Sequence, residues 1–129
     1  IRQESDEDTR FSEMPAFGDD FLEDEEIASV VNYVMSLSGE AQDANLVSAG
    51  AVVFEENCAS CHSEDGTGDR EQGAPNLTDA IWLFGGDYDS LTETVTYSRK
   101  GVMPDWNERL TEAQIRAVTT YVHQLGGGE

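Results

Sequence analysis

The stretch Cys58-Ala59-Ser60-Cys61-His62 decides how this chain folds and what it holds. It is a C-x-x-C-H sequence, the pattern of covalent c-type haem attachment. Two thiols three residues apart at the end of a helix reach both vinyl groups of one porphyrin and form thioethers. The imidazole of the next residue then lies over the iron from the same side. The spacing therefore predicts one covalent haem c, held by Cys58 and Cys61, with His62 as an axial iron ligand.

Two other readings of the cysteine pair are open. A structural zinc site needs four nitrogen or sulfur ligands, and only His123 remains after the C-x-x-C-H stretch. A thiol–disulfide active site usually begins a helix after a strand, whereas Cys58 and Cys61 follow an apolar helical pattern. Both alternatives are less well supported than haem.

The sixth iron ligand is expected to be a methionine. Met35 lies on a predicted helix and is assigned to packing, whereas Met103 lies in Gly101-Val102-Met103-Pro104, just ahead of the last helical pattern. The proline stiffens this loop, and Gly101 lets the backbone approach the ring closely. The sequence therefore predicts His62 and Met103 as axial ligands, a pairing that raises the reduction potential.

Further residues are candidates for contact with the haem. His62 must donate its second ring N–H to an acceptor, for which the carbonyl of Pro75 is the candidate. Three aromatic residues are expected to wall the porphyrin, although each is equally compatible with ordinary core packing: Trp82, Tyr97 and Trp106. Arg99 is a candidate partner for the haem propionates, although a solvated surface position is an equally good reading.

The hydrophobic pattern predicts an all-α fold with long loops. Apolar residues recur at helical spacing over about 24–37, from 47 to 58, and in a last helix that follows a capping box at Thr111 and ends at Gly126. Ser90-Leu91-Thr92-Glu93 resembles a capping box ahead of a short helix that reaches about Ser98. The segment 63–75 is rich in Gly and Asp and is expected to be a loop.

The net charge of the chain argues against some classes of binding partner. It has 27 acidic against 7 basic residues and a formal net charge of −20. Such a charge argues against nucleic acid and anionic membranes as partners. No run of 18 apolar residues occurs, so no transmembrane segment is expected within this sequence.

An internal repeat divides the chain. Met14-Pro15-Ala16-Phe17 matches Met103-Pro104-Asp105-Trp106, and four residues of the helical pattern behind it recur 88 positions later: Ile27, Tyr33, Val34 and Leu37 match Ile115, Tyr121, Val122 and Leu125. Residues 1–43 are therefore expected to be the tail of a first copy and its linker, and 44–129 a complete second copy. Met14 is expected to bind no iron in this chain, because its own attachment sequence would lie before residue 1.

Beyond the motif, several strings resemble a known family. They are Gly73-Ala74-Pro75-Asn76-Leu77-Thr78-Asp79, Trp82-Leu83-Phe84-Gly85-Gly86, Gly101–Trp106 and the Gly-rich end from Tyr121. With Cys58–His62 they resemble the second haem domain of the dihaem cytochrome c subunit of cbb3-type haem-copper oxidases, over residues 46–129. The resemblance implies a class I cytochrome c fold, in which Gly50, Phe54 and Tyr121 match the contact between the first and last helices.

The resemblance also implies a function. It implies electron transfer toward the catalytic subunit of the oxidase, without substrate chemistry of its own, on the periplasmic side of the bacterial inner membrane. The implied partners are the other oxidase subunits and an electron-donor protein, with a membrane anchor elsewhere in the parent protein. Two alternatives stay open: a haem-based gas sensor, and the cytochrome subunit of a periplasmic dehydrogenase.

Overall fold

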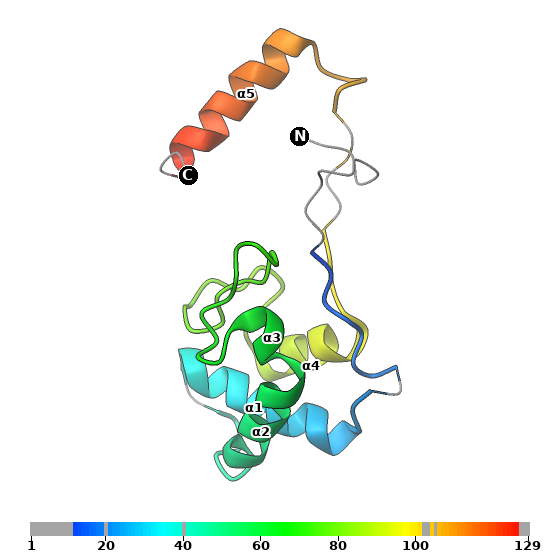
Figure 1. Ribbon diagram of the computed structural model, residues 1–129, viewed down its shortest axis with the longest axis vertical. Coiled ribbons are helices and arrows are strands. Elements are labelled where there is room, and N and C mark those ends of the chain that lie inside the picture. The colour runs from blue at the N-terminus through cyan, green and yellow to red at the C-terminus, as the bar shows by residue number, and fades with distance from the viewer. Residues whose placement is uncertain (1–11, 20, 40, 102–103, 105, 127–129) are drawn as a thin grey trace. The chain divides into compact units, whose positions relative to one another are not determined.

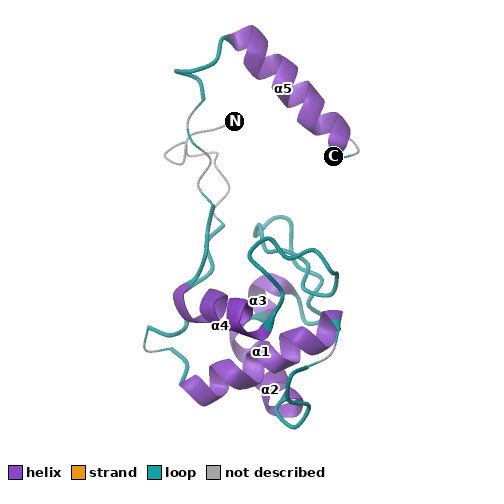
Figure 2. Cartoon of the chain, turned by 180° about the vertical axis from the view of Figure 1, so that it is seen from behind, coloured by secondary structure: helices purple, strands orange, loops and turns teal. Residues whose placement is uncertain are grey.

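The fold is helical, as the sequence predicts. The computed structural model describes residues 12–19, 21–39, 41–101, 104 and 106–126. Its helices are α1 (Asp24–Ser38), α2 (Val47–Asn57), α3 (Ala59–His62), α4 (Tyr88–Tyr97) and α5 (Glu112–Leu125), as Figures 1 and 2 show. Within these ranges β pairing is limited to one isolated bridge between Asp69 and Ala74. None of the described helices is long and apolar enough to span a bilayer.

The chain separates into two compact units. One unit, Arg10–Lys100, contains α1 to α4, and the other comprises Ile1–Thr9 and Gly101–Glu129 and contains α5. Met103, the expected sixth ligand, lies outside the described residues. The predicted domain boundary between residues 43 and 44 stays a prediction. The two units are defined by contacts within the chain, whereas the predicted boundary separates the two copies of the sequence repeat.

The core of the first unit forms where α1 packs on α2 and α4. Its buried apolar side chains come from α1 and from three later positions: Ile27, Val30, Val31, Val34, Phe54, Leu77 and Leu91. The rings of Tyr33 and Phe54 are 5.1 Å apart between centroids. Gly50 makes the close approach possible, because a Cβ there would lie 2.0 Å from the carbonyl oxygen of Ser29. Helix α1 therefore covers the Gly50–Phe54 face of α2.

Local hydrogen bonds set the helix ends. The Thr111 capping box at the start of α5 is confirmed, with Thr111 and Gln114 each accepting a backbone N–H from the other. The proposed capping box at Ser90 is wrong. The N-cap of α4 is Asp87, which accepts hydrogen bonds from the Ser90 backbone and hydroxyl at 3.0 and 2.7 Å. The carboxylate is the stronger acceptor, so the helix begins three residues earlier than the serine suggests.

Replacing Asp87 with alanine should lower the thermal unfolding midpoint at neutral pH, because α4 loses its N-cap acceptor. The Ser90 hydroxyl and N–H hold the pKa of Asp87 below its ordinary value of 3.8. A carboxyl with a lowered pKa stabilises the fold fully above its unfolded value and loses that effect as pH falls through the folded value. The difference between variant and parent should therefore shrink below about pH 4. Asp89→Ala, which removes a charge from the same turn without removing the cap, is the matched control.

Candidate haem site

The His62 side chain is oriented as a metal ligand. It is 9% exposed, and its Nδ1 lies 3.1 Å from the carbonyl oxygen of Pro75, the acceptor expected from the sequence. A carbonyl can only accept, so Nδ1 carries the hydrogen and Nε2 keeps its lone pair. Burial lowers the pKa of His62 below its ordinary value of 6.5, with the Pro75 hydrogen bond acting in the opposite direction. The imidazole is thus neutral with Nε2 free to coordinate iron, the form that a metal requires.

The two cysteines and the histidine follow one another along a helical path. The Cys58 N–H donates to the Phe54 carbonyl at 2.8 Å, which ends α2, and the His62 N–H donates to the Cys58 carbonyl at 2.9 Å, which closes α3. Both thiols are free, Cys58 partly buried and Cys61 exposed. One helical turn therefore separates His62 from Cys58. The donor set of two free thiols and one oriented imidazole fits covalent attachment of a haem.

The loop after His62 sets the position of Pro75. The Gly68 N–H donates to the His62 carbonyl at 2.8 Å, and an Asp69–Ala74 pair of hydrogen bonds closes the turn. Gly68 has φ of +81°, and a Cβ there would lie 2.6 Å from the carbonyl oxygens of both Ala74 and Pro75. Only glycine permits this approach. Sequence reasoning missed Gly68, since nothing in a Gly-rich loop marks which glycine meets another backbone.

The alternative readings of the cysteine pair gain no support from the site. Burial, and then the nearby Cys61, raises the pKa of Cys58 to about 11, whereas a thiol–disulfide active site needs a lowered thiol pKa. In the described ranges no three His, Cys, Asp or Glu side chains converge in a way that would hold a metal ion. A zinc site of Cys58, Cys61 and His62 would need such convergence.

The remaining site candidates lie in different environments. Trp82 is partly buried and packs against Gly86, where a Cβ would lie 2.4 Å from Trp82 Cδ1. Tyr97 is 71% exposed at the end of α4. Trp106 belongs to the second unit, where the guanidinium carbon of Arg109 lies 5.5 Å from its ring centroid. Their proposed contacts with the porphyrin stay predictions.

Arg99 is engaged by its own neighbours. Its guanidinium pairs with Glu93, donates to the Phe84 carbonyl at 3.2 Å, and lies 5.7 Å from the centroid of the Phe84 ring. A haem propionate would share this cation with Glu93. The role of Arg99 toward the haem also stays a prediction.

In the described residues, a helical fold with free C-x-x-C thiols and an adjacent histidine that presents Nε2 defines a c-type cytochrome. Residues 45–122 match the family model described as cytochrome c oxidase, cbb3-type, subunit III. The chain belongs to this family, and its cofactor is covalent haem c.

The relatives agree with the family match. The chain is 61% identical over its full length to the cbb3-type cytochrome c oxidase subunit CcoP of Cereibacter sphaeroides, of which it covers 45%. It is 52% identical to the CcoP subunit of Rhodobacter capsulatus, covering 46% of that protein. Over 94% of its length it is 51% identical to the subunit FixP of a Bradyrhizobium strain, covering 42%. The chain thus spans less than half the length of these relatives.

Proposed function

We propose that this chain passes single electrons through one covalent haem c toward the catalytic subunit of a cbb3-type oxidase in aerobic respiration. The observation that carries the proposal is the His62–Pro75 contact beside two free thiols, because it presents a neutral imidazole nitrogen where the attachment sequence requires one. The family match and the subunit names of the relatives support the same role.

The proposed haem-binding residues fall into three groups. Cys58 and Cys61 form the thioethers, and His62 and Met103 are the axial ligands. Pro75 orients His62, and the haem contacts proposed around them are Trp82, Tyr97, Arg99 and Trp106. When bound, the haem iron supplies the one-electron couple, which methionine ligation poises at a higher potential than two nitrogen ligands would.

The protein's own residues would hold the iron in one coordination state. The Pro75 carbonyl fixes the tautomer and ring orientation of His62, and the loop closed at Gly68 keeps that carbonyl in place. With His62 and Met103 as its ligands, the iron would have no position left for a substrate. We therefore infer electron transfer without substrate chemistry, and we assign catalysis to the parent complex.

The partners follow from the family and the charge. The relatives are named as subunits of cbb3-type oxidases, so other subunits of such an oxidase are the proposed partners. We place the chain on the periplasmic side of the bacterial inner membrane, within a membrane-anchored parent protein. A surface with a net charge of −20 would attract a basic patch on an electron-donor protein and raise its association rate at low salt.

Acid acetone tests the covalent haem directly. The haem-loaded chain should keep its colour on the precipitated polypeptide, because thioether bonds survive conditions that break coordination bonds. The reduced protein should also show the absorption bands of low-spin c-type haem. Colour that moves entirely into the organic phase would show that Cys58 and Cys61 do not attach it.

Carbon monoxide separates electron transfer from gas sensing. The ferrous chain should show little spectral change when CO is added at neutral pH, because His62 and a methionine occupy both axial positions. A gas sensor with an open or easily vacated site would shift its spectrum at once. A full CO spectrum in the unmodified chain would therefore contradict the proposed role.

A further inference from the structure

Two serine residues end helices in a backbone conformation that glycine usually occupies. Among the described residues, Ser63 and Ser98 are the non-glycine residues with positive φ, at 66° and 60°, and their ψ angles are 156° and 152°. A residue with a side chain keeps this conformation only where its surroundings hold it there. In each serine the hydroxyl makes a hydrogen bond that a glycine could not make.

The Ser63 hydroxyl holds the loop that follows His62. It donates to the Gly68 carbonyl at 2.9 Å, while the Gly68 N–H donates to the His62 carbonyl at 2.8 Å. Both backbone groups of Gly68 are thus bonded to the residues that begin the loop. A Cβ at Gly68 would lie 2.6 Å from the carbonyl oxygens of Ala74 and Pro75. The Ser63 hydroxyl therefore fixes the backbone against which the Pro75 carbonyl lies.

A second chain of hydrogen bonds runs from Ser63 to the residues beyond Pro75. The Gly66 N–H donates to the Ser63 carbonyl at 3.1 Å, and the Leu77 N–H donates to the Gly66 carbonyl at 2.7 Å. The Leu77 side chain is buried in the core. Pro75 is therefore held through Gly68 and through Leu77, and both connections begin at Ser63.

We propose that Ser63 is a positioning residue for the haem: its hydroxyl sets the strength of the hydrogen bond between His62 Nδ1 and the Pro75 carbonyl, and through it the reduction potential of the iron. This inference rests on the proposed haem site. A well-directed bond at Nδ1 makes the imidazole a stronger electron donor, which favours ferric iron. Glycine at position 63 would relieve the backbone strain but would leave the Gly68 carbonyl without this donor.

Ser63→Gly separates the role of the hydroxyl from that of the backbone. Glycine adopts the same φ without strain, so the haem-loaded variant should fold. Its reduction potential should rise, because a less firmly held Pro75 carbonyl leaves His62 a weaker electron donor. At a fixed electrode potential the ratio of ferrous to ferric haem should increase about three- to tenfold, less than the roughly 100-fold effect that loss of a ligand's direct hydrogen-bond partner can have.

The His62 ring proton gives a second readout that is specific to this contact. In the ferrous haem-loaded parent the Nδ1–H is hydrogen-bonded to Pro75 and should exchange slowly with solvent. In Ser63→Gly the loop opens more often, so the same proton should exchange several-fold faster. Proton NMR of the ferrous form follows this exchange.

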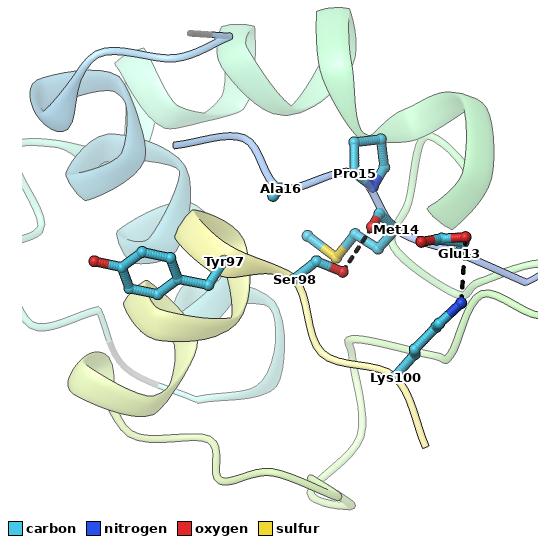
Figure 3. A pocket seen from close by; sticks show the side chains of 7 residues that line it. All are labelled: Glu13, Met14, Pro15, Ala16, Tyr97, Ser98 and Lys100. Atoms are coloured by element: carbon cyan, nitrogen blue, oxygen red, sulfur yellow. Dashed lines mark hydrogen bonds and ion pairs between the residues drawn. The ribbon is translucent and has the colours of Figure 1, made fainter. Parts of the chain in front are cut away.

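Ser98→Gly is the matched control. The Ser98 hydroxyl donates to the Met14 carbonyl at 2.6 Å, and Figure 3 shows the two residues facing each other. The variant removes the same group from the same backbone conformation and leaves the loop of residues 63–75 unchanged. It should alter the denaturant midpoint about as much as Ser63→Gly does, while the His62 ring proton should exchange as in the parent.

Thr67→Ala is a control within the loop itself. The Thr67 hydroxyl is exposed and donates to Asp65 Oδ1 at 2.7 Å, so its removal should leave the reduction potential unchanged. The inference requires both readouts to change in Ser63→Gly, and an unchanged potential or an unchanged exchange rate would overturn it. Equally fast exchange in Ser98→Gly would overturn it as well, because the effect would then not come from the hydroxyl of Ser63.

Acid acetone on every form separates this inference from the proposed function. Colour that leaves the parent polypeptide would contradict the proposed covalent haem. A parent that keeps its colour, together with a Ser63→Gly variant that matches it in potential and exchange, would contradict the role of Ser63 alone.

Discussion

A chain in which Cys58 and Cys61 are both replaced by serine should retain no haem after acid acetone. The two thiols are free in the structure. Cys58 lies one helical turn before His62, and Cys61 directly precedes it. Both are therefore available for attachment beside that ligand. The effect should be close to complete, since serine cannot form a thioether. The pigment bound per polypeptide, measured after denaturation, should fall to background.

Loss of attachment should also reduce the stability of the variant. The described apolar core is small, and a cofactor that binds the folded state adds to the free energy of unfolding. Ser60→Ala is the matched control, because it changes the exposed residue between the two cysteines and leaves both thiols in place. Haem that stays on the polypeptide of the double-serine variant would refute the assignment.

Gly50→Ala should destabilise the chain by about 1–3 kcal/mol, the usual cost of overpacking. A Cβ at Gly50 would lie 2.0 Å from the Ser29 carbonyl oxygen and 2.9 Å from Tyr33 Cβ, atoms of a helix that cannot shift singly. The sign of the change in the free energy of unfolding shows whether this close contact exists. In a helix without such a contact, alanine is favoured over glycine by about 0.5–1 kcal/mol. Denaturant unfolding of the haem-loaded chain measures the difference.

Gly39→Ala is the control for Gly50→Ala. Gly39 ends α1 with extended backbone, and a Cβ there would meet nothing closer than 3.9 Å, the Met35 carbonyl oxygen. Its free energy of unfolding should stay within about 0.5 kcal/mol of the parent. A Gly50 variant as stable as the parent, or more so, would mean that α1 does not cover this face of α2 in solution.

The attachment motif and most of the helices can be predicted from local sequence signals. Cys58, Cys61 and His62 are consecutive parts of one motif, so their spacing is local and needs no tertiary information. The Pro75 carbonyl was also identified correctly as the acceptor for His62, because a ligating imidazole needs a partner for its second nitrogen. The helix expected over about 24–37 is α1, Asp24–Ser38, since its apolar periodicity and the glycine behind it are local signals.

Local rules failed where two neighbouring groups competed. Ser90 and Asp87 both resemble N-caps, and the carboxylate is the one that α4 uses. Gly68 is one of several glycines in its loop, and only the fold shows that it lies against Pro75. At α4 the stronger acceptor of a local hydrogen bond decides the cap. At Gly68 the close approach of the Pro75 backbone decides which glycine is required.

The tertiary structure alone decided which segment covers the Gly50–Phe54 face of α2. The repeat supplies two segments, 14–37 and 103–125, with matching apolar residues at matching positions, so periodicity cannot rank them. The free energy of apolar burial depends on the area removed from water and not on which segment covers it. A helix from either copy that excludes water from Phe54 therefore contributes about the same free energy. In this structure the connection through residues 39–46 joins α1 to α2 directly, and the short closure favours that helix on entropic grounds.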